Sequence, residues 1–564
     1  MYLLQGVFLP DQNKGEEGCS EKTGDDAQRD LCAGEISRRR IYYDQENGAH
    51  QSRHRDHLFV VLSYQHTGQM GHNQTDPANG AADADGGGGF MMIRDGKTGK
   101  NVFLDFRENA PANAAPDMYT PKAPGSNYDK DLGNVYGGKS VGIPGDVAGL
   151  LYALEHYGTM TPEQVISPAA KLAREGYVVT PLLHGDMAEH ATQLKTYGDG
   201  WKIYLKDGQA WPVGSMISNP DLADTLDKIA AGGKDAFYKG EIADRIIAQV
   251  EKDGGVLSHA DLENFTVRVL EPVRGTYRGY EIISSPPPSS GGAHISQILN
   301  VLENFDLSSL EVNSVEYLHL FSEVFKMCYA DRAAHMGDPN FVKVPLEGLL
   351  NKDYAKELAA RFDPETSQKP VAGDPWKFES MSTTHFSIAD KEGNLVGVTR
   401  TINHFFGSCV VPEGTGFLLN DEMEDFSLDP NSANAVAGNK VPLSSMSPTF
   451  ILKDGKPFAV LGSPGGTRII SSLVQVISKL IDHGMSLEEA IGSPRIGDDH
   501  TDKMIYETRI PAETIEKLQA MGHPVKAYSD WDRIMGSVNG CVVLPDGTIT
   551  GAADPRRDGL AVGL

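Results

Sequence analysis

A threonine at the start of a strand-like stretch is the residue whose position first suggests catalysis. The stretch STTHFSIAD begins at Ser382 and follows a polar, proline-containing connector at about residues 366–380. Exposed connectors of this kind are readily cut. A break before Thr383 would give that residue a free α-amino group beside its hydroxyl, so that one residue would supply both a nucleophile and the base that activates it.

A second hydroxyl is expected opposite Thr383. The loop Lys391-Glu392-Gly393 joins two alternating stretches, a pattern typical of a β-hairpin. Pairing about this loop places Thr401 across from Thr383, with Cβ atoms about 5 Å apart, and it leaves Asn403 on the same face. The pattern also fits an ordinary pair of threonines in a β-ladder, and a β-bulge would shift the register by one residue.

A glycine turn offers a site for developing negative charge. The motif GSPGGTR, residues 462–468, joins a strand to a helix, with Thr467 as the expected N-cap. Amides at a helix start attract anions, and the consecutive Gly465 and Gly466 would let a substrate oxygen approach them, as an oxyanion hole requires. The motif matches neither the P-loop nor the dinucleotide fingerprint. A plain strand–helix turn is the alternative.

Charged and hydroxyl groups complete the set. Alternation along residues 102–106 directs the apolar side chains to one face, so that Arg107 shares the other face with Asp105. The acidic patch NDEMEDF (420–426) could hold an ammonium group, or it could be a solvated loop. The turn PLSSMSP (442–448) presents hydroxyls suited to a carboxylate. Together these groups suit an α-amino acid whose side chain carries a reactive acyl group.

Regular elements must position these residues. A hairpin is predicted over residues 90–107, and the motif PPPSSGG (286–292) forms a rigid turn before a helix. Apolar periodicity predicts helices at Pro162–Glu175, at Val315–Ala334, near Thr467–His483 and near Pro511–Met521. Strands and helices in this order predict layered sheets covered by helices.

Composition limits the class of protein. The chain has 564 residues and a net charge of −26, which argues against nucleic acids and anionic membranes as partners. No apolar run reaches the length of a membrane span. The amino terminus shows no basic start followed by an apolar core, so no secretory signal is visible. The cysteines are odd in number, and their spacing predicts neither a disulfide framework nor a zinc site: Cys19, Cys32, Cys328, Cys409 and Cys541.

Residues 1–85 differ from the rest of the chain. They contain Arg38-Arg39-Arg40, five histidines between His50 and His72, and one good apolar run, Leu58–Leu62. This composition indicates a disordered or poorly packed extension. The histidine spacing is too irregular to predict a metal site.

Several motifs from about Gly86 to the carboxyl terminus carry a family resemblance. They are GGGGFMMIRDG, LDFRENAP, YGTMTPEQVISPAAKLAREG, SSPPPSSGGAHISQILNVLENFD, YADRAAHMGDPNFVKVP, TTHFSIADKEGNLVGVTRTIN, LLNDEMEDFS, PLSSMSPT, GSPGGTRII and GAADPRRD. With these motifs in register, the chain strongly resembles the γ-glutamyltransferase (γ-glutamyltranspeptidase) family of N-terminal-nucleophile hydrolases.

The resemblance implies an α+β fold, the four-layer αββα sandwich of N-terminal-nucleophile hydrolases. The precursor would cut itself before Thr383 into a large chain, residues 86–382, and a small catalytic chain, residues 383–564, that stay together. The implied reaction cleaves the γ-glutamyl amide of glutathione and related compounds through an acyl-enzyme. The glutamyl group would pass to water or to an amino acid or peptide amine. No metal or organic cofactor is implied.

The resemblance also implies a role for each matching residue. Thr383 would be the nucleophile, its new amine the base, and Thr401 the supporting hydroxyl. The other residues fall into three groups: Gly465 and Gly466 for the oxyanion; Arg107, Ser444 and Ser445 for the α-carboxylate; Asn403, Glu422 and Asp425 for the α-amino group.

Two departures from the family pattern have consequences. Only Ser427–Leu443 separates the acidic motif from PLSSM, where some members carry a longer lid, so we expect an open cleft that tolerates longer γ-glutamyl substrates. Residues 1–85 lack the strand and helix that normally precede the four glycines. We interpret this segment as genuine but atypical, or as a misread, frame-shifted one.

Two alternatives stay open. One is a β-lactam side-chain acylase of the same fold, although a simple diacid lacks the amine that the acidic patch would hold. The other is an inactive scaffold that stays uncut because residues 1–85 are defective. Because bacterial relatives are usually exported, the resemblance implies a periplasmic or extracellular protein despite the missing signal.

Overall fold

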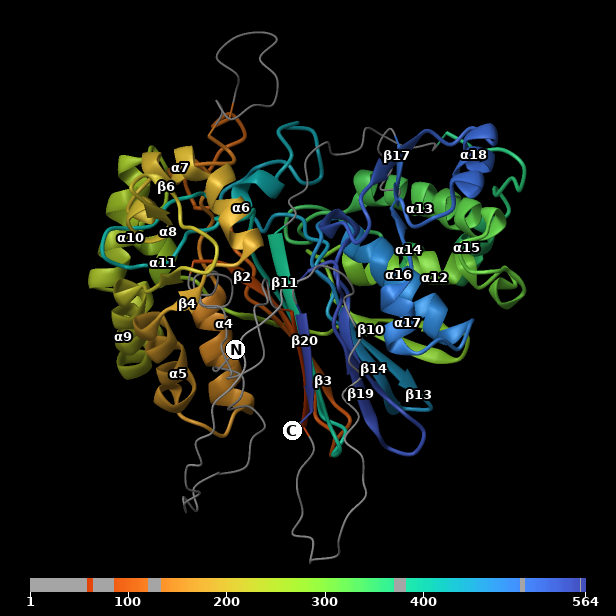
Figure 1. Ribbon diagram of the computed structural model, residues 1–564, viewed down its shortest axis with the longest axis horizontal. Helices are drawn as coiled ribbons and strands as arrows, with labels where there is room; N and C mark the ends of the chain where they lie inside the picture. Colours follow the sequence, from red (N-terminus) through yellow and green to blue (C-terminus); the bar gives the residue numbers. More distant parts are fainter. Residues whose placement is uncertain are drawn as a thin grey trace, which may run out of the picture.

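The computed structural model describes residues 58–63, 86–119, 133–369, 382–497, 503–557 and 559–563. Two β-sheets lie against each other in the middle of the molecule, and helices cover the outer face of each sheet (Figure 1). The predicted αββα order of layers is therefore confirmed.

The first sheet has seven strands. Their order is β20 (Gly559–Gly563), β1 (Leu58–Ser63), β11 (Ser382–Asp390), β12 (Leu395–Asn403), β2 (Gly88–Arg94), β3 (Asn101–Asp105) and β8 (Arg268–Leu270). All neighbouring strands are antiparallel. The sheet thus joins strands from the beginning, the middle and the end of the chain.

The second sheet has six strands and packs on β11 and β12 of the first. Their order is β19 (Ile549–Ala552), β18 (Asn539–Val543), β14 (Lys456–Gly462), β13 (Thr449–Lys453), β10 (Tyr280–Ser284) and β9 (Val273–Tyr277). Shorter pairings lie outside the sandwich: β15 (Ile496–Gly497), β16 (Met504–Glu507) and β17 (Val525–Tyr528); β4 (Tyr177–Val178) with β7 (Met216–Ile217); β5 (Leu205–Lys206) with β6 (Gln209–Ala210).

The helices on the first sheet's side come from one continuous region. They are α4 (Asp146–Tyr157), α5 (Pro162–Glu175), α6 (Pro181–Glu189), α7 (Ala191–Thr196), α8 (Gly200–Tyr204), α9 (Pro220–Tyr238), α10 (Glu241–Lys252) and α11 (His259–Glu263). Thr161 caps α5 with a capping box, which explains why this helix starts where the sequence predicts.

The helices on the second sheet's side come from two regions (Figure 1). They are α12 (Gly291–Leu302), α13 (Val315–His335), α14 (Leu346–Leu349), α15 (Lys352–Ala359), α16 (Arg468–Ile481), α17 (Leu487–Gly492) and α18 (Ala512–Ala520). Short 3-10 turns are η1 (Gly138–Ser140), η2 (Leu307–Ser309), η3 (Glu422–Asp425) and η4 (Arg533–Met535). The predicted helices at 162–175, 315–334, 467–483 and 511–521 are confirmed within two residues at each end.

Both faces of the first sheet are buried. Met91, Leu104 and Phe106 pack with α4 on one side, whereas Phe90 and Phe103 enter the core between the sheets. The alternation predicted for the hairpin is therefore confirmed, and it places residue 107 where β3 ends.

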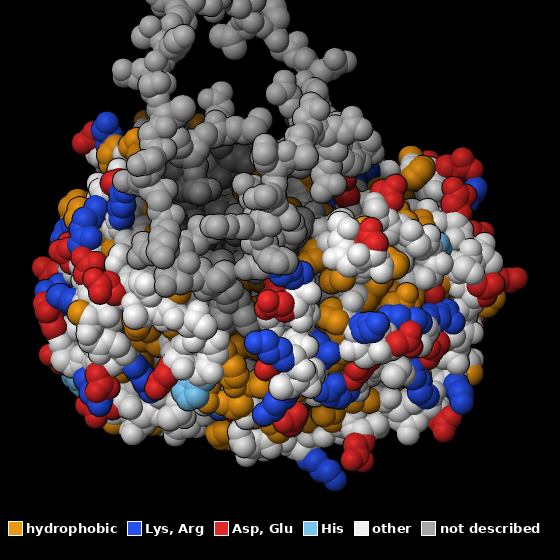
Figure 2. All heavy atoms as spheres, turned by 90° about the horizontal axis from the view of Figure 1, so that it is seen from below, with side chains coloured by type: hydrophobic (Ala, Val, Ile, Leu, Met, Phe, Trp, Pro, Cys, Tyr) orange, Lys and Arg blue, Asp and Glu red, His pale blue; other side chains and the backbone are white. Residues whose placement is uncertain are grey.

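The described surface carries charges of both signs. Figure 2 shows acidic and basic side chains interspersed over one face. Among the described residues, no helix is both long and apolar enough to cross a bilayer.

One strand comes from the atypical amino-terminal segment. β1, which contains the apolar run of residues 58–62, pairs with β11 on one side and β20 on the other. Of residues 1–85, the structure describes only Leu58–Ser63. The histidines between His50 and His72 therefore lie outside the described residues. Most of the connector at 366–380 lies outside them too.

Candidate active site

The two threonines face each other in the first sheet. β11 and β12 form the predicted hairpin, and Thr383 pairs with Thr401, so the register prediction is confirmed. A bulge lies one residue earlier, where Ser382 pairs with Asn403. The irregularity therefore falls between Ser382 and Thr383, at the bond where a cut is expected.

Asn403 ends β12 in a left-handed conformation, with φ 77°. Its N–H donates to Thr401 Oγ1 (2.8 Å), and its side-chain amide donates to the carbonyl of Asp421 and to Glu424. Left-handed backbone is tolerated by asparagine better than by most residues. The turn thus fixes the Thr401 hydroxyl and joins it to the acidic motif.

The glycine turn has the backbone that its sequence requires. Gly465 and Gly466 have φ values of 131° and 58°, a region that side chains rarely adopt. A Cβ at Gly465 would also lie 2.8 Å from the backbone of Gly536. Among the residues that the structure describes, neither glycine N–H has a hydrogen-bond acceptor. Thr467 precedes α16 as predicted, but its side chain makes no cap hydrogen bond.

Arg107 lies at the centre of the buried charges. It is ion-paired with Glu422 and Asp425, both from η3. Its guanidinium also donates to the carbonyls of Pro442 (3.1 Å) and Leu443 (3.0 Å). The structure therefore brings together the end of the hairpin at residues 90–107, the acidic motif and the PLSSM turn, as the sequence predicts.

Carboxylates outnumber cations around Arg107. Burial raises the pKa of Glu108 to about 8, against the opposing effect of Arg107, and its oxygens have no hydrogen-bond partner among the described residues. Burial likewise raises the pKa of Glu422. Burial alone would lower the pKa of Arg107, but the carboxylates outweigh it and raise that pKa. The arginine therefore stays charged, while the surplus acids hold protons more tightly than usual.

The serine pair is held by a contact that the sequence did not predict. Arg332, in the last turn of α13, donates to Ser445 Oγ (2.9 Å) and to Ser290 Oγ (2.7 Å). Ser290, from the PPPSSGG turn, donates in turn to the carbonyl of Ser444. These bonds fix the turn whose hydroxyls the sequence assigned to carboxylate binding.

Two further contacts near the candidate site were missed, one at Thr383 and one at the acidic motif. Arg557, from the DPRRD motif, donates to the carbonyl oxygen of Thr383 (2.8 Å). His404 lies 2.6 Å from Asp421; burial lowers its pKa, but Asp421 outweighs this effect and raises it to about 9. No alternation or spacing signals either contact, because each joins segments that only the fold brings together.

A small pocket, partly open to solvent, collects these residues. Its lining contains Arg107, Thr383, Thr401, Asn403, Glu422, Asp425, Ser444, Ser445 and Gly466, together with Leu443, Met446 and Ile469. Of the residues singled out from the sequence, only Gly465 is not part of the lining.

Comparisons with known proteins identify the family of the chain. Residues 81–564 match the family model described as gamma-glutamyltranspeptidase. A glutathione hydrolase proenzyme of Escherichia coli (strain K12) is 41% identical, with 85% of this chain and 84% of the relative covered. The corresponding protein of Bacillus subtilis (strain 168) is 39% identical, with the same coverage.

Acylases are also among the relatives. Acylase ACY 1 proenzyme of Pseudomonas sp. (strain SE83) is 40% identical, with 85% of each chain covered. The crystal structure of a cephalosporin acylase from Bacillus halodurans superposes with a TM-score of 0.79 at 25% identity, covering 93% of this chain and 99% of that one. The sandwich is thus the N-terminal-nucleophile hydrolase fold. The family match spans more than four-fifths of the sequence, and the chain belongs to the gamma-glutamyltranspeptidase family.

Proposed function

We propose that this protein is a self-processing γ-glutamyl hydrolase and transferase that acts on glutathione and related compounds. The observation that carries the proposal is the shared pocket, which Thr383 lines together with one buried arginine and two carboxylates. A substrate held by those charges would present its side-chain acyl group to the threonine.

The charge pattern favours a zwitterionic head group. In the structure, Arg107 is neutralised by Glu422 and Asp425. An α-carboxylate could take one side of the guanidinium, while the α-ammonium group takes the carboxylates that it releases. Each ion pair within the protein would be exchanged for one with the ligand, so no buried charge is left unpaired. An unpaired buried charge would cost several kcal/mol.

The proposed chemistry uses groups of the protein alone. After cleavage before Thr383, the free amine would accept the hydroxyl proton as oxygen attacks the γ-carbonyl carbon, and it would return that proton to the leaving amine. The amides of Gly465 and Gly466 would stabilise the oxyanion. Water or an acceptor amine would then attack the γ-glutamyl ester, releasing glutamate or a new γ-glutamyl amide.

Self-processing would divide the chain into residues 86–382, with whatever precedes them, and residues 383–564. The bulge at the expected cut supports this position. The bond from Arg557 to the Thr383 carbonyl would hold the new amino-terminal residue in place. We also propose a periplasmic or extracellular location, which cell fractionation would test.

The rival activity is the removal of acyl side chains from β-lactams. The acylase relatives favour it, because they are about as similar to this chain as the glutathione hydrolases are. The pocket argues against it, since a glutaryl group offers no ammonium to Glu422 and Asp425. Parallel assays of γ-glutamyl and glutaryl anilides would separate the two activities.

Replacement of Thr383 tests the proposal directly. Thr383→Ala should leave a single 61.0 kDa chain on denaturing electrophoresis, with no turnover of a γ-glutamyl anilide. The matched control is Thr384→Ala, one residue on, which should still be cut and active. Cleavage of the Thr383→Ala protein would refute the assignment, and sequencing the new amino terminus of the native protein would give the position of the cut.

The short loop after η3 bears on substrate length. Residues 427–443 fold back on themselves, and Asn434 ties the two ends by bonds to the carbonyl of Asp425 and the N–H of Leu443. We propose that this compact loop leaves room for γ-linked oligoglutamate. Rates should therefore change with chain length beyond one glutamate, and equal rates would count against the idea.

A further inference from the structure

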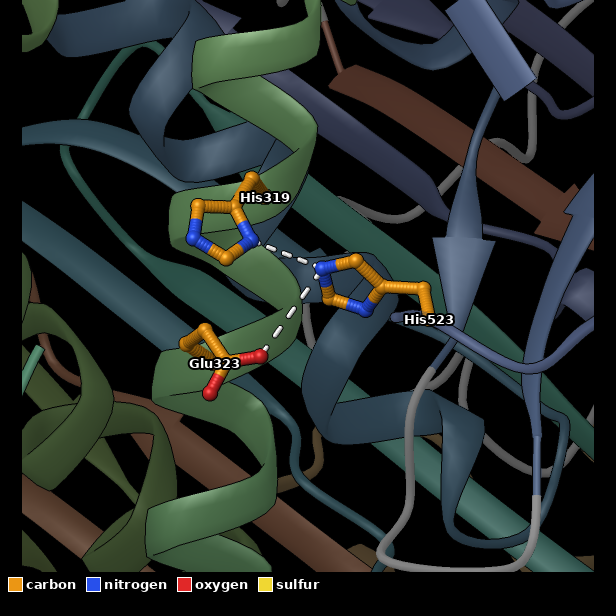
Figure 3. Close-up of side chains that lie close together, drawn as sticks. All are labelled: His319, Glu323 and His523. Carbon is orange, nitrogen blue, oxygen red and sulfur yellow. Dashed lines mark hydrogen bonds and ion pairs between the residues drawn. The ribbon is translucent and has the colours of Figure 1, made fainter. Parts of the chain in front are cut away.

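A buried group of metal-ligand side chains lies apart from the active-site pocket. His319 and Glu323 stand one turn apart on α13, and His523 reaches them from the segment after α18 (Figure 3). All three side chains are almost fully buried. Their nearest ligand atoms all lie within 4.8 Å of one another.

The outer nitrogen of each imidazole already has a partner. His319 Nε2 lies 2.7 Å from the carbonyl oxygen of Asp363, so that nitrogen carries the proton and Nδ1 presents its lone pair. His523 Nδ1 lies 3.3 Å from Ser322 Oγ, which can accept its proton. Metal-bound histidines usually have their second nitrogen held in this way.

The inner nitrogens then point at each other. His319 Nδ1 and His523 Nε2 are 2.7 Å apart, and Glu323 Oε1 is 3.8 Å from the latter (Figure 3). Two bare lone pairs would repel each other at 2.7 Å, so the space between the two nitrogens is filled. Either one proton or one metal ion must occupy this position.

We propose that His319, Glu323 and His523 bind a divalent cation of the zinc type. Two imidazoles and one carboxylate form a familiar zinc ligand set.

Binding of zinc would require the ligand atoms to shift. With bonds of about 2.0–2.1 Å and tetrahedral angles, ligand atoms around zinc lie roughly 3.3 Å apart. The two nitrogens would therefore separate by about half an ångström, and Glu323 Oε1 would move closer to His523 Nε2 by a similar amount.

The ammonium group of Lys326 competes for Glu323, with which it is ion-paired. It also donates to Ser367 Oγ (2.9 Å) and to the carbonyl of Gln368 (2.8 Å). These two bonds would keep Lys326 satisfied if the Glu323 carboxylate turned to a metal ion.

The site would join segments from both sides of the expected cut, a consequence that rests on the proposed self-processing. α13 and Asp363 precede Thr383, whereas His523 follows it. A bound ion would therefore link the large chain to the small one, and zinc should raise the midpoint of thermal unfolding of the cut protein.

Cobalt and zinc binding to the full-length protein tests the proposal. After treatment with a chelator, the protein should bind one cobalt ion with the visible absorption of four-coordinate cobalt, and zinc should displace it. His523→Gln should abolish this signal and lower the zinc content by one ion per chain. The surface variant His156→Gln on α4 is the matched control and should behave like the native protein.

The histidines between His50 and His72 could bind metal as well, so the measured quantity is the difference between variants. If circular dichroism shows that His523→Gln does not fold, Glu323→Gln replaces it. Its metal affinity should fall by more than the roughly 10–100-fold that is typical when a partner outside the ligand set is replaced. Equal metal content and spectra in the native and variant proteins would overturn the proposal, and the pair would then be bridged by a proton only. A native protein that binds no metal would overturn it as well. Because Thr383 is unchanged, neither outcome depends on the γ-glutamyl activity.

Discussion

Two buried clusters of charged side chains are built in opposite ways. The cavity cluster (Arg107, Glu108, Glu422 and Asp425) has one cation for three acids, and burial raises the pKa of Glu108 and of Glu422. The structural cluster (Arg495, Glu507, Asp554 and Arg556) pairs each acid with arginine. There burial raises the pKa of Asp554, but its two arginines outweigh this effect and lower it.

The difference separates stability from binding. In the structural cluster, the Asp554 carboxylate accepts hydrogen bonds from Arg495, from Arg556 and from the N–H of Val538. Little of its capacity to accept further hydrogen bonds is left. In the cavity cluster, both Glu108 oxygens lack partners among the described residues. Surplus acid next to an open pocket is a cost to folding that a cationic ligand group can relieve.

Breaking the structural cluster should have the largest effect. Asp554→Asn leaves Arg495 and Arg556 with one fewer buried counter-charge, which typically costs about 3–5 kcal/mol. Urea unfolding of a protein with Thr383 intact would measure the loss. The exposed variant Asp235→Asn, which removes a surface ion pair with Lys239, should cost about 1 kcal/mol or less. Equal effects of the two variants would contradict the distinction.

Arg107→Lys should disable the cavity cluster without unfolding the protein. Lysine keeps the charge but cannot make the forked contacts of the guanidinium. Losing one partner of a buried, hydrogen-bonded charge pair costs about 2–5 kcal/mol. We therefore expect kcat/KM for a γ-glutamyl anilide to fall by about 100-fold or more, with chain cleavage retained on a gel. A loss of less than about threefold would mean that Arg107 does not contact the substrate.

Asp425→Asn should change substrate preference by a smaller amount. The variant keeps the shape of the side chain but removes one charge that would hold the substrate ammonium. A charge-assisted hydrogen bond contributes about 1.5–3 kcal/mol, so the rate on a γ-glutamyl anilide should fall about tenfold or more. The rate on a glutaryl anilide, which has no amine, should stay level or rise. Equal losses on both substrates would remove the argument for Asp425.

The last prediction concerns the pH dependence of stability. The pKa of Glu108 is about 8 in the folded protein, against an ordinary value of 4.5. Between these values the folded state binds a proton that the unfolded state has lost, so stability should fall as pH rises from about 4.5 to 8. Glu108→Gln should flatten this fall in urea unfolding at several pH values, while the exposed variant Glu392→Gln should not. An unchanged slope would show that Glu108 does not titrate in this range.

The sequence predicted most of what depends on local pattern. The capping residue of α5, the hairpin loop at Gly393 and the turn at Gly465 are local signals, and the corresponding elements were predicted correctly. The contacts of Arg332 with Ser445, and of Arg557 with Thr383, join residues more than a hundred positions apart. No periodicity encodes such pairs, because they depend on how the layers stack.

The surplus of acid around Arg107 was only partly visible in the sequence. The acidic motif identified Glu422 and Asp425, but Glu108 lies next to Arg107, where a neighbouring ion pair would be the simplest interpretation. Its missing partners become apparent only when burial is known. The place of β1 between β11 and β20 was equally hidden, since a single apolar run does not specify its partners.

The order of strands in the first sheet has a consequence for how the two chains could ever separate. Strands that precede the expected cut (β1, β2, β3 and β8) are interspersed with strands that follow it (β11, β12 and β20), and β1 is enclosed between two later strands. Pulling the chains apart would break the β1–β11, β1–β20 and β12–β2 ladders together. Strands of the two cut chains therefore alternate within one sheet, and subunits should not exchange between molecules without global unfolding.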